Sequence, residues 1–179
     1  IGSQANGYRL GMQAGRIFYY DANKNWWSRA GIPEDMPEGE PGGPDTEVFY
    51  DFQTPHDGKY GVECHPNCDC GRFLEIGNAV FMQYVKASDG TFGLLRKPNV
   101  DFGGGLERIA AASNNNPDIF QTDVFQDVIA LLEHYSDEGK TYANSLYTKS
   151  YRIIADHIRA AIFMIVDGVR PQFPNQGFS

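Results

Sequence analysis

The sequence predicts an α+β fold, with an antiparallel sheet in the first part of the chain and helices in the last third. Two observations support this prediction. Strand-like segments follow one another with only short turns between them, which favours antiparallel pairing over a parallel, Rossmann-like sheet. From Thr122 onwards, apolar residues recur at helical spacing instead.

Several segments before residue 90 are predicted to be extended. Residues 16–22 (RIFYYDA) are β-branched and aromatic, which predicts a strand, whereas the Gly- and Pro-rich stretch 31–44 predicts a loop. Residues 46–52 alternate, which predicts a half-buried strand with Glu47 and Asp51 on its open face. The long apolar segment 72–85 predicts a central strand, and Gly77 within it indicates a bulge or a close approach.

The remaining elements follow from turn and helix signals. A turn at residues 88–90 returns the chain towards a short strand at 99–102, after which a helix begins at Leu106. Thr122 is expected to cap a second helix that ends before Gly139, and a third helix is expected at 150–166. A domain boundary between residues 139 and 150 would separate segment 1–140 from a helical segment 141–179.

Composition narrows the class of protein. The chain of 179 residues, with 41% hydrophobic residues, is expected to fold as one domain or two small ones. There is neither an apolar run of roughly 20 residues, as a membrane span needs, nor a secretory signal, so we expect no membrane partner and a cytoplasmic location. A net charge of −8 argues against a broad basic surface for nucleic acid. Because the chain opens at Ile1, we expect a fragment of a longer protein.

All three cysteines lie between Cys64 and Cys70. An odd number of cysteines in one short loop does not fit a disulfide framework. Cys64, His65, Cys68 and Cys70 offer enough thiolates and imidazole for a closed tetrahedral Zn²⁺ site, although their spacing is tighter than in zinc fingers. His56 is a spare candidate ligand, and three reduced thiols without metal are the alternative.

The most informative motif is VDFGGGLER at residues 100–108. It predicts a strand, a glycine turn and the start of a helix. Glycines let the backbone lie against a flat or anionic ligand, Arg108 in the first helical turn can pair with phosphate oxygens, and Asp101 offers a carboxylate to an ammonium group. The alternative is a plain strand-to-helix turn with a surface Glu–Arg pair. The motif is neither a P-loop nor a GxGxxG turn.

Five blocks of the sequence together resemble the alanyl-tRNA synthetases, a family of class II aminoacyl-tRNA synthetases. Residues 100–111 resemble the third class II signature in its VDTGMGLERIAA form. Residues 25–31, 41–51, 73–84 and 155–171 resemble NFW…G, GPCGPCSEIFYD, LEIWN-VFMQY and ADHIRA…DGV-P, in the family's order. The resemblance implies a class II sheet flanked by helices, with 1–140 as the later part of the catalytic domain and 141–179 as the start of the tRNA-recognition region.

The resemblance implies an aminoacyl-tRNA ligase that activates L-alanine with ATP and Mg²⁺ and transfers it to tRNA(Ala) for protein biosynthesis. Asp101 would hold the alanine ammonium group. Asn78 and Val80 would shape the alanine pocket, and Trp27 would form its wall.

The same resemblance implies an ATP site. Arg108 would contact the ATP phosphates, while Gly103 and Gly105 let the nucleotide lie against the turn. Glu47 and Glu75 would serve the adenine end and the Mg²⁺–phosphate end. Of these residues, Arg108 and Glu75 are expected to be catalytic together with Asp101.

For tRNA, the resemblance implies contacts from Arg152 and Arg159 on the last helix and from Asn175 beyond it. A solvated helix face is the alternative for the two arginines. His157 on the same helix is expected to be solvated or hydrogen-bonded.

Three departures from the family pattern affect these expectations. Gly77 replaces the tryptophan of LEIWN, which is expected to open space near the active site, and the cysteines of GPCGPCSE are absent. No first or second class II signature is recognisable before Gly7, so the chain is not expected to form adenylate unaided. Two other functions stay open: an amino acid ligase with another acceptor, and a non-catalytic, zinc-stabilised binding module derived from a synthetase.

Overall fold

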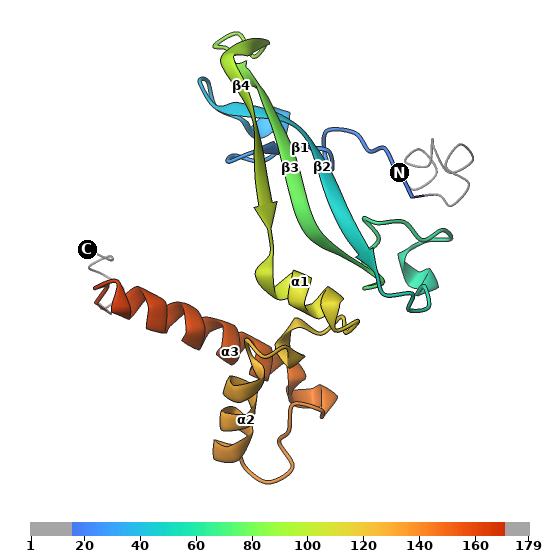
Figure 1. Cartoon of the computed structure of the whole chain (residues 1–179), viewed down its shortest axis with the longest axis vertical. Helices are drawn as coiled ribbons and strands as arrows, with labels where there is room; N and C mark the ends of the chain where they lie inside the picture. Colours follow the sequence, from blue (N-terminus) through green and yellow to red (C-terminus); the bar gives the residue numbers. More distant parts are fainter. Residues whose placement is uncertain (1–15, 171–179) are drawn as a thin grey trace. The chain divides into compact units, whose positions relative to one another are not determined.

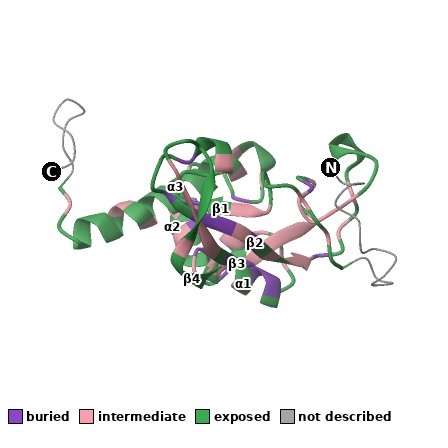
Figure 2. Ribbon diagram, turned by 90° about the horizontal axis from the view of Figure 1, so that it is seen from above, coloured by how far each residue is buried: buried purple, intermediate pink, exposed green. Residues whose placement is uncertain are grey.

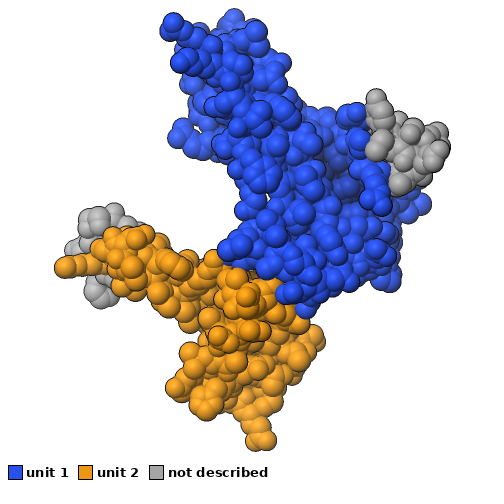
Figure 3. All heavy atoms as spheres, viewed as in Figure 1, with its two compact units in different colours: residues 1–117 blue, residues 118–179 orange. Residues whose placement is uncertain are grey.

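A computed structural model describes residues 16–170 and confirms the α+β fold (Figure 1). The chain divides into two compact units, residues 1–117 and 118–179 (Figure 3). The first unit holds the four-stranded sheet and helix α1, and the second holds α2 and α3. The division falls before residue 140, the boundary expected from the sequence, and the assignment of the two segments to catalytic and tRNA-reading domains stays a prediction.

The sheet is an antiparallel meander in which every strand pairs with its neighbour in sequence, in the order β1-β2-β3-β4. Its strands are β1 (Trp26–Ser28), β2 (Pro41–Asp51), β3 (Phe73–Lys86) and β4 (Phe92–Gly104). Short connections explain this order, because antiparallel neighbours need no crossover helix. The 14-residue strand β3 is the predicted central strand.

Strand β2 begins earlier than predicted, because the end of the expected loop 31–44 is part of the sheet. A Cβ atom on Gly43 would lie 1.8 Å from the carbonyl oxygen of Phe81, so glycine is needed here for the close approach of β2 and β3. The register between these strands shifts between Gly42 and Asp45, next to Pro44. A proline is tolerated at such an irregularity because its missing N–H leaves no ladder bond unmade.

Strand β4 is a single long strand and not the short segment 99–102 that was predicted. Pro98 lies inside it, where the pairing with β3 jumps from Met82–Asn99 to Tyr84–Leu94. The proline therefore occupies a bulge and does not break the strand. The predicted turn at 88–90 is present, with Gly90 at φ +82° and the Ala87 N–H donating to the Thr91 carbonyl at 2.8 Å.

Gly77 lies beside a register shift, as its position inside a strand predicted, but it does not open space. A Cβ atom on Gly77 would lie 3.0 Å from Cζ of Phe102. The Phe102 ring, on the neighbouring strand β4, thus occupies the volume that a larger residue at position 77 would need.

The segment 16–22 is not a strand, although its composition favours one. A cleft of about 1400 Å³ separates it from β2. Its contacts are made by side chains and not by a ladder: the Tyr20 N–H donates to Oδ1 of Asn25 at 2.9 Å, and the Tyr20 hydroxyl lies 2.8 Å from Nδ1 of His65. Strand propensity produced no strand here because none of the strands in residues 16–170 pairs with this segment.

Helix boundaries differ from the predictions in the second unit. α1 (Leu106–Ser113) begins where expected, whereas α2 (Gln126–Tyr135) begins after Thr122, the predicted cap. The Thr122 hydroxyl instead donates to the Ile119 carbonyl at 2.6 Å, closing the short 3₁₀ helix Ile119–Gln121. α3 (Ser145–Val166) begins before residue 150, because the side chain of Asn144 accepts from the Leu146 N–H and caps it. Two further 3₁₀ helices span Pro33–Asp35 and Gly58–Tyr60.

The core of the second unit lies between α2 and the first half of α3. Its buried members are Phe125, Ile129, Tyr142, Tyr151 and Ala155. The second half of α3 is mostly exposed in this chain (Figure 2). No helix among residues 16–170, α3 included, combines the length and the hydropathy that crossing a bilayer requires.

Candidate active site

Strands β2, β3 and β4 bring most of the predicted site residues onto one face of the sheet. Alternate residues of a strand share a face, and cross-strand pairing extends that face over the neighbouring strands. Two neighbouring rows of paired residues make the floor of a cleft: Glu47–Asn78–Gly103 and Asp45–Val80–Asp101.

This cleft has a volume of about 560 Å³, within the range of small-molecule sites. The predicted site residues that line it are Trp27, Glu47, Glu75, Asn78, Val80, Asp101, Gly103 and Gly105. They come from all four strands and from the glycine turn before α1. Residues up to 78 positions apart in sequence are thus gathered at one place, and they come from four of the five sequence blocks.

A pair of polar side chains in the cleft has unfilled hydrogen-bonding capacity. Nδ2 of Asn78 donates to Oδ2 of Asp45 at 2.8 Å, and Asp45 is only 8% exposed. The other oxygens, Oδ1 of Asp45 and Oδ1 of Asn78, are buried and accept no hydrogen bond from the described residues. Leaving such an acceptor unpaired costs about 1–3 kcal/mol, so the cleft favours a ligand that carries N–H or O–H donors.

The sequence analysis did not single out Asp45 as a site residue. The sequence nonetheless contained the information needed to predict it. Asp45 precedes Glu47 by two positions in an extended segment, so the two side chains share a face. Asn67 and Lys24 also line the cleft and were not predicted.

Glu47 is half-buried and not on an open face as predicted, while its neighbour Val48 is 52% exposed. Burial, followed by the carboxylates of Glu75 and Asp45, raises the pKa of Glu47 to about 7 against the opposing effect of Lys24 and Arg108. This carboxyl therefore keeps its proton to a higher pH than an ordinary glutamate. A cation that enters the cleft would displace the proton.

Arg108 and Glu75, both predicted to be catalytic, form an ion pair. Nη1 of Arg108 donates to Oε2 of Glu75 at 2.8 Å and lies 3.3 Å from the Glu75 carbonyl oxygen. Gly105 leaves room for this arrangement, because a Cβ atom there would lie 3.1 Å from Cδ of Arg108. Arg108 itself does not line the cleft in this structure, and Glu75 connects it to the cleft wall.

The cysteine loop gathers three of the four predicted metal ligands and replaces the fourth. The side chains of His56, Cys64, Cys68 and Cys70 place one ligand atom each within 4.8 Å of one another. His65 takes no part in this cluster, because its Nδ1 faces the Tyr20 hydroxyl.

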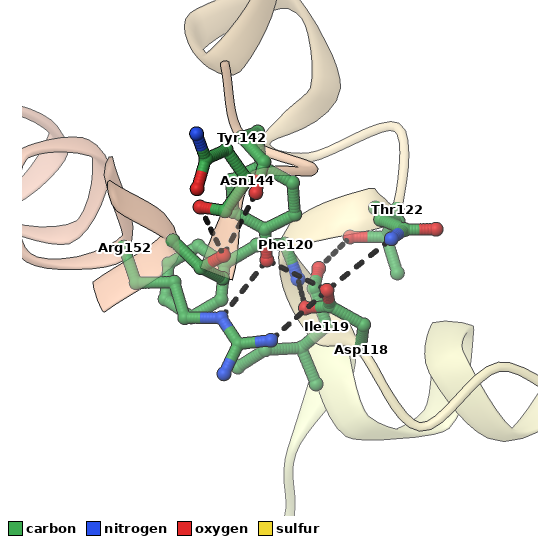
Figure 4. A network of polar contacts seen from close by, with 9 residues as sticks. Asp118, Ile119, Phe120, Thr122, Tyr142, Asn144 and Arg152 are labelled. Carbon is green, nitrogen blue, oxygen red and sulfur yellow. Dashed lines mark hydrogen bonds and ion pairs between the residues drawn. The ribbon is translucent and has the colours of Figure 1, made fainter. Parts of the chain in front are cut away.

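The predicted tRNA-binding arginines of α3 have structural partners in the second unit. Arg152 donates from Nε to the Tyr142 hydroxyl at 2.9 Å and pairs with Asp118 at 3.0 Å, while the same hydroxyl donates to Asp118 at 2.6 Å (Figure 4). Arg159 lies over the Phe125 ring at 5.0 Å. Asn175 lies outside the described residues, so the tRNA contacts of all three stay predictions.

His157 is hydrogen-bonded within its helix, as expected. Its Nδ1 lies 2.6 Å from the Ile153 carbonyl oxygen, one turn earlier in α3. This contact gives one ring nitrogen a hydrogen-bond partner inside the helix.

Comparison with known proteins gives one family. The family model described as tRNA synthetases class II (A) matches residues 7–178. The alanine–tRNA ligase of Treponema denticola is 41% identical over 159 residues, which cover 88% of this chain and 25% of the relative. The alanine–tRNA ligases of Treponema pallidum and Borrelia hermsii are 36% and 37% identical over 94% of this chain, covering 26% and 27% of those proteins. The chain therefore spans about a quarter of the length of these relatives.

Proposed function

Because the chain belongs to the class II tRNA synthetases, we propose that its cleft is part of a site that activates L-alanine with ATP for transfer to tRNA(Ala). The observation that carries this proposal is the row Asp45–Val80–Asp101 with the unpaired acceptors of Asp45 and Asn78 beside it. The names of the relatives support alanine as the amino acid. The cytoplasm is the expected compartment.

The acceptors of the cleft suit an ammonium group. An ammonium ion has three donors, and the cleft is lined by the Asp101 carboxylate together with the side chains of Asp45 and Asn78, each of which has one oxygen that accepts no hydrogen bond from the described residues. Val80, which is only 6% exposed, provides an apolar floor between the two aspartates for a methyl side chain. Trp27 bounds the same cleft and would limit the size of the amino acid.

The nucleotide would lie towards the glycine turn. Gly103 has nothing within 4 Å of the position where a Cβ would be, so a flat base or a phosphate can approach its backbone. Arg108, held by Glu75, would turn towards the phosphates when they offer a competing anion. The Glu75 carboxylate raises the pKa of Glu47, and neighbouring carboxylates of this kind fit Mg²⁺.

The reaction requires little acid–base catalysis from these residues. A carboxylate oxygen of alanine attacks the α-phosphorus of ATP, the bond to the pyrophosphate oxygen breaks, and negative charge develops on the leaving group. Mg²⁺, when bound, supplies part of the charge that stabilises pyrophosphate. Asp101 fixes the amino end so that the carboxylate is aligned, and Arg108 offers a guanidinium to the phosphates.

The tRNA-binding part of the proposal concerns Arg152, Arg159 and Asn175. Arg152 would have to give up or share its bonds to Tyr142 and Asp118 in order to contact a phosphate. The expected Zn²⁺ at the cysteine loop takes no part in adenylate formation, since that step needs neither a thiolate nor a metal-bound water.

Binding of a non-hydrolysable alanyl-adenylate analogue to the full-length protein tests this proposal. Asp101→Asn should weaken binding by about 10- to 100-fold, the value of a lost charge-assisted hydrogen bond. The matched control is Asp89→Asn, which removes a carboxylate from the 88–90 turn, outside the lining of the cleft. Equal affinity of the Asp101 variant and the control would reject the assignment.

A further inference from the structure

The loop that joins β2 to β3 holds every cysteine of the chain and two of its four histidines. We propose that this loop binds one structural Zn²⁺ through the three thiolates of Cys64, Cys68 and Cys70 and through Nδ1 of His56. The ligand set differs from the expected one at its fourth position. In Figure 1 the loop lies beside the ends of β2 and β3.

The ligand atoms lie about as far apart as a tetrahedral zinc site requires. Zinc–sulfur bonds of about 2.3 Å and zinc–nitrogen bonds of about 2.0–2.1 Å place the ligand atoms about 3.8 Å (S to S) and about 3.6 Å (S to N) apart. In the structure, Sγ of Cys64 lies 3.7 Å from Sγ of Cys70, and Sγ of Cys68 lies 3.7 Å from Nδ1 of His56. All four atoms lie within 4.8 Å of one another.

The imidazole of His56 is oriented for metal binding by its second nitrogen. Nε2 of His56 lies 2.8 Å from the Gly61 carbonyl oxygen, which can only accept, so Nε2 carries the proton. Nδ1 is then left with its lone pair towards the thiols. Metal-bound histidines commonly have such an outer hydrogen bond, which fixes the tautomer and the ring orientation. His65 lacks this arrangement, because its Nδ1 is occupied by the Tyr20 hydroxyl.

The chemistry of the four ligands selects the metal. Three soft thiolates and one imidazole favour Zn²⁺ over Mg²⁺ or Ca²⁺. Four protein ligands would leave no open position, so the site is structural and not catalytic.

The loop reaches the cleft at one point and is fixed to β2 at another, which gives the zinc a consequence for the site. Asn67, between Cys64 and Cys68, lines the cleft, and its N–H lies 3.5 Å from the Tyr20 hydroxyl. Arg72, two positions after Cys70, binds Asp51 at the end of β2 through two hydrogen bonds of 2.7 Å. Zinc would therefore hold one wall of the cleft in place. This consequence rests on the proposed function, whereas the metal site itself does not.

Metal content of the 179-residue chain purified without chelator is the test. We expect one zinc per chain in the unaltered protein and in His65→Ala, and less than about one tenth of that in His56→Ala after dialysis against a weak chelator. His56→Cys, which restores a fourth soft ligand, should retain the metal. The three thiols should be protected from a thiol reagent until the zinc is removed.

Replacement of zinc by Co²⁺ keeps the proposal testable even if His56→Ala does not fold. The Co²⁺ form of the unaltered chain and of His65→Ala should show the intense absorption of tetrahedral thiolate coordination. A chain without zinc whose three thiols react freely in the native state would overturn the site. Zinc retained in His56→Ala but lost in His65→Ala would overturn the ligand assignment. Either result leaves analogue binding at Asp101 as a separate question, since neither measurement involves adenylate.

Discussion

Replacing Glu47 by glutamine should stabilise the first unit at neutral and alkaline pH. Burial and the nearby Glu75 and Asp45 carboxylates raise the pKa of Glu47 to about 7, from 4.5 in an unfolded chain. The native state therefore keeps a proton that the unfolded state has already lost between pH 4.5 and 7. The protein loses stability across this window as pH rises, and the loss is complete above pH 7.

The size of the effect follows from the same shift. A difference of about 2.5 pKa units corresponds to about 3.4 kcal/mol, but Glu47 is only half-buried, and solvent screening reduces this to about 1–2 kcal/mol. Glu47→Gln has no carboxyl to ionise. Its free energy of unfolding should therefore exceed that of the unaltered chain by about 1–2 kcal/mol at pH 8 and by progressively less towards pH 4.5.

Urea denaturation followed by tryptophan fluorescence is a suitable assay. Both tryptophans of the chain, Trp26 and Trp27, lie in the unit that contains Glu47, so the signal reports on that unit. Glu38→Gln, at an exposed loop position, is the control and should leave the pH profile unchanged. A constant difference between Glu47→Gln and the unaltered chain from pH 4.5 to 8 would refute the reasoning, as would a variant that is less stable at pH 8.

Three further predictions concern packing and charge. Gly43→Ala should destabilise the first unit by about 1–3 kcal/mol or more, since the new Cβ would meet the rigid Phe81 carbonyl. Gly58→Ala is the control, because nothing lies within 4 Å of its Cβ position and its φ is not positive; equal losses for the two variants in urea denaturation would refute the clash. Arg152→Met should destabilise the second unit by about 1–3 kcal/mol, because it removes the ion pair with Asp118 and the hydrogen bond to Tyr142. Unchanged hydrogen exchange of α2 and α3 would count against this network. Glu75→Gln should weaken ATP binding to the full-length protein less than Arg108→Ala does. The first variant releases Arg108 from its ion pair, whereas the second removes the proposed phosphate contact. The reverse order of affinities in calorimetry would contradict these roles.

The parts of the fold that were predicted correctly depend on local sequence. The long apolar run at 72–85, the turn with Gly90 and the strand–glycine–helix motif before Leu106 contain their own start and stop signals. The strand predicted at 16–22 was wrong because strand propensity does not reveal whether a partner strand lies alongside. The last strand was predicted only from residue 99, because only the register with β3 shows that Pro98 occupies a bulge inside a longer strand.

The sequence motifs single out residues that the structure brings together, but not the contacts between them. The glycine turn, Asp101 and Asn78 followed from the motifs, and the structure brings them to one cleft. That Asn78 bonds Asp45 and that His56, not His65, faces the cysteines depends on contacts between distant parts of the sequence. Phe102 over Gly77 is a similar case, because each residue departs from the family pattern and the two departures meet across neighbouring strands.

Alanine-dependent ATP–pyrophosphate exchange by the full-length protein carrying Asp101→Asn tests the central claim most directly, because it separates the two substrates. The account places Asp101 at the alanine ammonium group, on the row with Val80 and Asp45, and places the nucleotide at the glycine turn. The KM for alanine should rise about 10- to 100-fold, while the KM for ATP should change by less than about threefold. An equal rise in both constants, or no change in either, would contradict the assignment of this cleft to alanine.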